Sequence, residues 1–384
     1  MRIRAGTSCW RPSTRNELTR RLLHLAISFA TFPSFTLFFG LRTGPGAFML
    51  FFRQSDAERR RMAFSADAGT HKYAQGDAAH GVYKVNSLVL TDDVDPLHGD
   101  VHWDPARSLW NGAMLAASLA VAPWFFTWSA LSLCIVLLLI TMCTGHSVGF
   151  HRRLIHRTFK CGKWTERFLV WSGTLVGMQG PFWVIRSHDI RDWAQRQRDC
   201  HAFLKHGRGA WMDGWWNLHC KLLLRRPPGF DPGRGIGDDP FYRFLQRTWM
   251  LQQVPLAAAL FLLGGWPWVI WGVCVRVTIG VSMHWFVGYL CHTHGPQSWI
   301  VDHGAVQAHD VPWAAIPSMG ESWHNNHHAF PASARHGLYP GQLDLGYSFI
   351  KLLERVGLVW DVQTPDTLPP RSGITAVRPA AAQH

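Results

Sequence analysis

Charged residues are scarce in this sequence. Only 16% of its 384 residues are Asp, Glu, Lys or Arg, whereas 47% are hydrophobic, and soluble chains average about 25% charged residues. A sizeable part of the chain is therefore expected to avoid water. The eight cysteines include no CxxC pair, which argues against a secreted disulfide scaffold and against a zinc ribbon.

Two long segments almost lack charge. Residues 109–145 carry no charged side chain over 37 positions, and residues 249–290 carry only Arg276. Each segment is about twice the ~20 residues that one helix needs to cross a hydrocarbon core of ~30 Å. Pro123 interrupts the first segment and a Gly-Gly-Trp-Pro run (264–267) interrupts the second. Both segments therefore predict a helical hairpin.

Two hairpins make four transmembrane helices, which we expect at about 109–126, 128–145, 250–269 and 273–291. Arg276 would lie close enough to the second turn for its side chain to reach the far interface. Residues 151–248 carry a net charge of +10, and cytoplasmic loops prefer Lys and Arg. The sequence therefore predicts an all-α, integral, multi-pass membrane protein whose two hairpins carry a helical cytoplasmic cap.

The rest of the chain divides around these hairpins. We expect a variable amino-terminal region at 1–107, in which the apolar segment 22–40 is interfacial or signal-like. The main domain would occupy 108–361. The Pro-rich tail 362–384 is expected to be disordered.

Histidine is unusually frequent, with 22 residues. Many of the histidines gather in four segments. GHSVGFHRRLIHRTF (145–159) follows the predicted second span, and CHTHG (291–295) follows the fourth. IRSHDIRDWAQR (185–196) lies between these two segments, and GESWHNNHHAFP (320–331) lies after them. A neutral imidazole is a good metal ligand near pH 7 because its ordinary pKa is about 6.5. The clusters therefore predict a metal site on the cytoplasmic side.

The spacing within GESWHNNHHAFP favours a joint site. His324, His327 and His328 are related as i, i+3 and i+4, which places them on one face of a helix. His151 and His156 are five apart, so their rings would point about 140° apart on an α-helix of ~3.6 residues per turn. That pair would have to bind from a helix end or serve different metals.

The motif at 188–192 repeats the i, i+3, i+4 spacing with different residues. His188 is followed by Arg191 and by Asp192, whose carboxylate is an acceptable iron ligand. A ligand set of imidazoles with an occasional carboxylate, and without thiolate, favours iron over a structural zinc.

These motifs resemble those of the membrane fatty acid desaturases of the acyl-CoA desaturase type. The resemblance covers residues 109–361 and rests on HRRLIH (151–156), HDIRD (188–192), GYLCH (288–292) and GESWHNNHHAFP (320–331), of which the last is the most specific. It implies a four-span protein whose cytoplasmic cap holds two irons. Such a protein uses dioxygen and two electrons to introduce a cis double bond into a long-chain fatty acyl substrate, carried by CoA or by a lipid.

The resemblance also assigns the metal ligands of this chain, which are His151, His156, His188, Asp192, His292, His324, His327 and His328. Two departures affect this assignment. The usual second motif has two adjacent histidines where this chain has Arg191 and Asp192, and a guanidinium cannot ligate iron because it stays protonated. Gly288 replaces an Asn that usually helps to hold one iron through a water. His201 and His206, spaced like the first motif, are candidate substitutes.

Two other functions stay open. A membrane di-iron hydroxylase acting on an acyl or alkyl chain would share the first hydrogen abstraction with a desaturase. A non-catalytic, histidine-rich metal transporter or sensor would instead place ligands inside the spans, where only His284 clearly lies.

The electrons for the chemistry must come from a separate protein. The chain has no CxxC pair of the rubredoxin type, no GxGxxG fingerprint and no haem-binding HPGG motif, which implies a separate ferredoxin-, rubredoxin- or cytochrome-type donor. The other expected partners are the acyl substrate, O2 and membrane lipid. No nucleic acid is expected, because the Lys and Arg of the basic loop flank membrane segments and histidine motifs and suit anionic lipid or an acidic donor.

Overall fold

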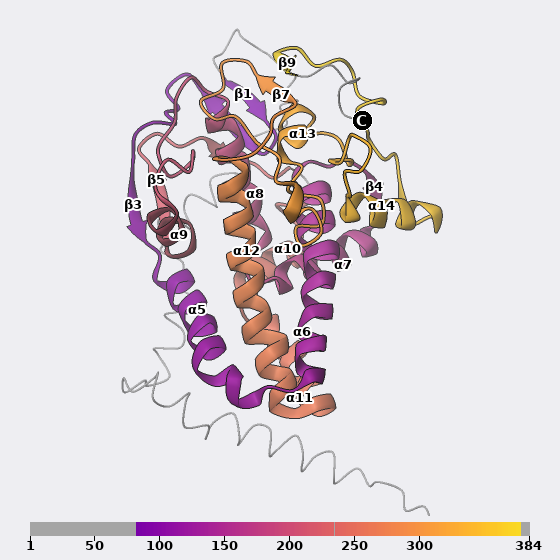
Figure 1. Ribbon diagram of the computed structural model, residues 1–384. Coiled ribbons are helices and arrows are strands. Elements are labelled where there is room, and N and C mark those ends of the chain that lie inside the picture. The colour runs from indigo at the N-terminus through magenta and orange to yellow at the C-terminus, as the bar shows by residue number, and fades with distance from the viewer. Residues whose placement is uncertain (1–81, 234, 378–384) are drawn as a thin grey trace, which may run out of the picture. The chain divides into compact units, whose positions relative to one another are not determined.

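The computed structural model describes residues 82–233 and 235–377 (Figure 1). All of the described residues belong to one compact unit. The predicted interfacial or signal-like segment 22–40, and most of the predicted region 1–107, lie outside the described residues.

Most of the described residues are helical, which agrees with the predicted class. The helices are α5 (Pro105–Ala116), the π-helix η1 (Ala117–Val121), the 3-10 helix η2 (Ala122–Phe125), α6 (Trp128–Ile140), the π-helix η3 (Thr141–Ile155), α7 (Lys163–Leu175), α8 (Pro181–Gln195), α9 (Ala210–His219), α10 (Pro240–Thr248), α11 (Gln253–Val269), the π-helix η4 (Ile270–Val275), α12 (Arg276–Cys291), the 3-10 helix η5 (Pro312–Ala314), α13 (His324–Ala329) and α14 (Leu345–Arg355).

Short strands pair segments of the loops between the helices, and the predicted all-α class did not include these strands. They are β1 (Val82–Val85), β2 (Leu88–Thr91), β3 (Gly99–Trp103), β4 (Lys160–Cys161), β5 (Cys220–Leu224), β6 (Gly229–Phe230), β7 (Trp299–Val301), β8 (Val359–Trp360) and β9 (Ile374–Ala376). Their antiparallel sheets have the orders β1-β2-β6, β3-β5, β4-β8 and β7-β9. No strand here exceeds five residues, which is too short for a clear alternation of hydrophobic and polar positions.

The first predicted turn coincides with a break between helices. Pro123 lies in η2, and Thr127 then caps α6, its hydroxyl accepting a hydrogen bond from the Ala130 amide at 3.1 Å. Trp124 and Trp128 at this turn are 86% and 75% exposed. An indole exposed at a helix end suits a membrane interface.

The second predicted turn also coincides with a break. Two stretches in the described part of the chain are long and apolar enough to cross a membrane, Trp128–Ile155 and Gln253–Cys291. Gly265, with φ 66° and ψ −159°, breaks the second stretch, and glycine tolerates this conformation because it lacks a Cβ. Beyond it the chain folds back, since the Gln253 Oε1 accepts a hydrogen bond from Arg276 Nη2 at 2.6 Å.

The side chain of Arg276 does not extend to the far interface, so that expectation is wrong. Arg276 is 1% exposed and donates to the carbonyls of Gly272 and Leu175, both at 2.7 Å, as well as to Gln253. It lies eleven residues past Gly265, beside the start of α11. Buried carbonyl and amide oxygens thus replace water around the guanidinium, as a buried charge requires.

The long helices carry apolar side chains on their outward faces. In α6, for example, Ile135 and Val136 are about half exposed, and Leu263 in α11 is 74% exposed. In Figure 1, α6 and α12 run side by side, with α7, α8 and α13 toward one end. Helices that are apolar on buried and exposed faces alike suit a lipid environment.

Helix η3 continues α6 toward α7 and α8, and two glycines set its position. A Cβ on Gly145 would lie 2.5 Å from the Ser172 backbone, and one on Gly149 would lie 2.4 Å from the Leu169 carbonyl oxygen. Only glycine allows so close an approach between the backbones of η3 and α7. This contact fixes the end of η3, which carries His151.

Residues 362–377 do not form the disordered tail that the sequence predicted. Strand β9 pairs with β7, and the Arg371 guanidinium donates to the carbonyls of His328 and Ala329 at the end of α13. These contacts order a Pro-rich segment that has little tendency to form regular structure by itself. Residues 378–384 lie outside the described residues.

Candidate metal centre

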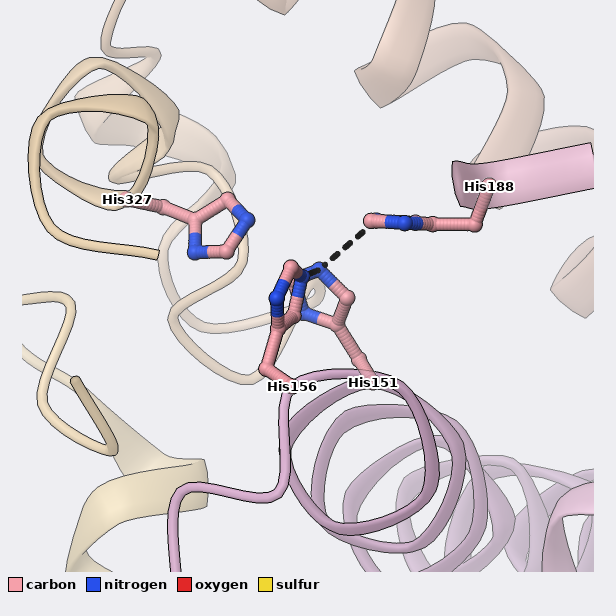
Figure 2. A group of neighbouring side chains, drawn as sticks. All are labelled: His151, His156, His188 and His327. Carbon is pink, nitrogen blue, oxygen red and sulfur yellow. Dashed lines mark hydrogen bonds between the residues drawn. The ribbon is translucent and has the colours of Figure 1, made fainter. Parts of the chain in front are cut away.

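Four histidines from three separate elements form a first cluster. His151 and His156 come from the end of η3, His188 from α8 and His327 from α13, and one nitrogen of each lies within 4.8 Å of the others. The Nε2 atom of His151 is 3.1 Å from that of His188 and 3.2 Å from that of His156. Figure 2 shows the four rings directed toward a common space.

His151 and His156 meet because η3 is a π-helix. The His156 amide donates to the His151 carbonyl at 3.0 Å, which is an i to i+5 hydrogen bond. This wider turn places residues five apart on the same face, whereas the α-helical turn assumed from the sequence would separate them. The separation of about 140° holds for an α-helix and does not apply here. Of the two alternatives for this pair, the structure favours binding from a helix end, because His156 is the C-cap of η3. Inserted π-helical turns are frequent at functional sites.

A second cluster contains His292, at the end of α12, with His324 and His328 of α13. The Nε2 atom of His324 is 3.3 Å from that of His292 and 3.1 Å from that of His328. His327, one residue from His328, belongs to the first cluster instead. The three α13 histidines therefore do not fall into one group, because α13 lies between the clusters and contributes residues to both.

The donor atoms fit metal ions. Two nitrogens that are each about 2.1 Å from one ion lie roughly 3.0–3.4 Å apart at tetrahedral or octahedral angles, and the Nε2 pairs here are 3.1–3.3 Å apart. The His151 Nδ1–H faces the Glu321 carboxylate, and the His292 Nδ1–H donates to the Gly288 carbonyl at 2.7 Å. The Nε2 atoms of His151 and His292 therefore carry lone pairs, and each lies within 3.3 Å of a neighbouring imidazole nitrogen in its own cluster. A cation would stabilise these lone pairs.

The protonation states of the three α13 histidines also suit ligation. Burial, with the neighbouring imidazoles, holds the pKa of His327 and of His328 well below the ordinary range. Burial lowers the pKa of His324 to about 4. These rings are neutral at pH 7, and a neutral imidazole is the form that binds a metal. Neither ring nitrogen of His327 has a hydrogen-bond partner among the described residues, although buried polar atoms normally have one.

A buried ionic network supports the first cluster. Glu321, which faces His151, accepts from Arg152 Nε at 3.1 Å, and Arg152 Nη2 donates to Asp344 at 2.8 Å. Arg152 is fully buried. His336 Nδ1 lies 3.5 Å from Glu321, so His151, Glu321 and His336 are close enough to suggest another metal group. We interpret this third group as support for His151, because Arg152 already neutralises Glu321.

Three further predicted ligands, Asp192, His201 and His206, lie outside the two clusters. Asp192 is buried beside the clusters, with its Oδ2 3.9 Å from His188 Nδ1 and 3.8 Å from Arg196. His201 is partly exposed, and its Nδ1 accepts from the Phe203 amide at 3.1 Å. His206 is buried, and its ring centroid is 5.0 Å from that of His292. Of the two candidate substitutes, only His206 thus lies against a cluster.

Sequence reasoning missed the supporting residues. Glu321 and Arg152 lie inside the recognised motifs, so their positions could have suggested a role for them. His336 and Asp344 follow the last motif without a recognisable spacing. Only the tertiary fold brings them to Arg152.

Comparisons with known proteins indicate the family of this chain. The model of the fatty acid desaturase family matches residues 126–340. The chain is 37% identical over 255 residues to an sn-1 stearoyl-lipid 9-desaturase of Synechocystis sp., covering 65% of this chain and 77% of that protein. It is 35% identical over 247 residues to an acyl-CoA 5-desaturase of Anemone leveillei, covering 64% and 75%.

A third relative is a chloroplastic palmitoyl-monogalactosyldiacylglycerol delta-7 desaturase of Arabidopsis thaliana, which is 35% identical over 259 residues. The match covers 64% of this chain and 65% of that relative's length. The two apolar stretches and this family together indicate a membrane-associated protein with a histidine-rich metal site. The chain belongs to the fatty acid desaturase family.

Proposed function

We propose that this protein is a membrane-bound, di-iron, dioxygen-dependent desaturase that introduces a cis double bond into a long-chain fatty acyl group carried by CoA or by a lipid. The observation that carries the proposal is the pair of histidine clusters on either side of α13, next to long apolar helices. The relatives are named for acyl-lipid and acyl-CoA substrates, and both classes suit the proposal.

The proposed membrane arrangement has four spans. The breaks near Pro123 and at Gly265 divide the apolar segments into two hairpins. Both clusters lie beyond the ends of these helices opposite the breaks, and the +10 segment 151–248 supplies residues to one of them. Because basic loops stay in the cytoplasm, the catalytic side is proposed to be cytoplasmic.

The two clusters are proposed to hold one iron each. The first iron would take His151, His156, His188 and His327, and the second would take His292, His324 and His328, with Asp192 as a carboxylate beside them. Bound iron supplies, with dioxygen and two electrons, the oxidising power to remove hydrogens from unactivated methylenes, which acid or base side chains lack.

The chain's own residues position and insulate this chemistry. Glu321 holds the proton of His151 on Nδ1, and the Gly288 carbonyl does the same for His292. Both His327 and His328 are at most 3% exposed, so the site excludes bulk water. A dry, fixed donor set strengthens electrostatic interactions and limits side reactions. Electrons are proposed to come from a separate ferredoxin-, rubredoxin- or cytochrome-type donor.

The alternatives make different predictions. A hydroxylase would share this site and the first hydrogen abstraction but would leave a hydroxyl group on the chain. A transporter would need ligands along a membrane path. His284, in α12, instead packs against His146 with ring centroids 4.4 Å apart, and neither residue belongs to the metal-ligating groups found in the described residues. This arrangement favours an enzyme.

The test is fatty-acid profiling in a host that lacks its own desaturase, with wild type, His327→Ala and His102→Ala. His102 is exposed on β3 and serves as the control. We expect wild type and His102→Ala to produce unsaturated acyl chains, and His327→Ala to produce none detectable by mass spectrometry. Hydroxylated chains in place of double bonds would identify a hydroxylase. Unchanged double-bond content in His327→Ala would refute the iron-site assignment.

A further inference from the structure

The two clusters are unequal, because the second has three histidines and the first has four. We propose that His206 is a further ligand of the metal ion at the second cluster, an inference that rests on the two-metal centre of the proposed function. The ring of His206 lies beside that of His292, with centroids 5.0 Å apart and planes inclined by 21°. It is 3% exposed.

A buried carboxylate holds the proton of His206 on Nδ1. Its Nδ1 lies 2.9 Å from Asp213 Oδ1, and Asp213 is fully buried. Trp285 Nε1 donates to the same oxygen at 2.9 Å, which fixes the carboxylate. A carboxylate on one imidazole nitrogen is the usual support of a metal-ligating histidine, because it sets the tautomer and orients the ring.

The opposite nitrogen lacks a partner. His206 Nε2 is buried and accepts no hydrogen bond from any described residue, whereas buried polar atoms are nearly always satisfied. His206 also has a φ of 52°, a backbone conformation that is unfavourable for a residue with a side chain. Strain of this kind persists where the surroundings fix the residue, and it is frequent at ligand sites.

The altered second motif supports the same carboxylate. Arg191, which stands where a ligating histidine is usual, donates from Nη2 to Asn217 Oδ1 at 2.6 Å. Asn217 in turn donates from Nδ2 to Asp213 Oδ1 at 3.1 Å. The residue that cannot bind iron therefore helps to orient Asp213 and, through it, His206. Arg191 and His206 thus belong to a single hydrogen-bonded arrangement.

The chain offers a matched control in His201. Its Nδ1 accepts from the Phe203 amide, its ring lies 6.3 Å from that of Trp216, and it is partly exposed. Both histidines precede α9 and are five residues apart. A loss seen for His206 but not for His201 would thus reflect the position of His206 rather than a general effect of removing a histidine from this loop.

The experiment measures iron in the purified full-length chain after anaerobic loading with Fe(II). The variants are His206→Gly and His201→Ala, and glycine is chosen because it accepts a φ of 52° without strain. We expect two irons per chain in wild type and in His201→Ala. In His206→Gly we expect one iron to remain firmly bound and the other to bind at least about tenfold more weakly in a chelator competition.

Added imidazole is the second readout, since it can occupy the space of the removed ring. We expect it to restore the weakened iron in His206→Gly, and thermal melting checks that the variant is folded. Two firmly bound irons in His206→Gly, or a loss that imidazole does not restore, would overturn the assignment. Wild type with two irons but without double bonds would refute the proposed activity and leave the role of His206 intact.

Discussion

The two histidine clusters are supported in different ways. In the first, the carboxylate of Glu321 holds His151, and the buried Arg152 joins that carboxylate to Asp344. In the second, a main-chain carbonyl holds His292, and a separate network from α8 and α9 ends at His206. The first cluster is thus supported by an ion-pair network joined through Arg152, and the second is supported by a main-chain carbonyl and by the buried Asp213 carboxylate.

This difference indicates which site tolerates change. A buried charge network fails when one member is removed, because the remaining charges lose their partners. A main-chain carbonyl cannot be removed by substitution. We therefore expect damage to the first cluster to be severe and local, and changes near the second cluster to be graded. Three substitutions test this contrast, Arg152→Met with the largest expected effect, then Glu321→Gln, and Gly288→Asn with the smallest.

Replacing Arg152 with methionine should have the largest effect on stability. Methionine approximates the volume of the side chain but leaves Glu321 and Asp344 buried without their cation. Removing one partner of a buried ion pair costs about 3–5 kcal/mol. Thermal unfolding in detergent should show a lower melting temperature and loss of the first iron.

Arg243→Met is the control for this substitution. Arg243 in α10 pairs with Asp238 at 3.0 Å, and the two side chains are 50% and 83% exposed. An exposed pair contributes about 0–1 kcal/mol, so the melting temperature should change little. Equal losses for Arg152→Met and Arg243→Met would contradict the special role of the buried network.

Glu321→Gln should weaken metal binding without unfolding the protein. The amide keeps the shape of the side chain but removes the negative charge opposite His151 Nδ1. Losing such a support typically lowers metal affinity about 10–100-fold. A chelator titration should show this loss at one iron only, and Glu354→Gln, from the surface pair with Lys351, should show none. Equal weakening of both irons would mean that the clusters share one support.

The sequence predicted the elements of the site better than their arrangement. Pro123 and Gly265 mark the helix breaks because their backbone preferences are local. The sequence left two alternatives for His151 and His156, and it could not choose between them, because their pairing depends on an i to i+5 hydrogen-bond register set by packing. The buried position of Arg276 was not predicted for a related reason, since its hydrogen-bond partners come from α11 and the end of α7.

The choice between His201 and His206 also required the fold. The two residues are spaced like the histidines of the first motif. This spacing involves both of them, so it cannot show which one lies at the site. Asp213, seven residues after His206, gave no signal, because the helix that carries it must pack against α12 before its carboxylate meets Trp285 and His206. Supporting residues are specified by tertiary contacts, so a single sequence shows the ligands more readily than what holds them.

Gly288→Asn should produce the smallest effect, and in the favourable direction. A Cβ at this position would meet nothing within 4 Å, so the side chain fits, and asparagine is slightly better than glycine within a helix. Its amide would add a polar group one turn before His292. One added hydrogen bond is worth about 0.5–1.5 kcal/mol, which predicts a few-fold tighter second iron in the chelator titration. Gly288→Ala provides the helix preference without the amide, so an equal gain in both variants would assign the effect to the helix and not to the metal site.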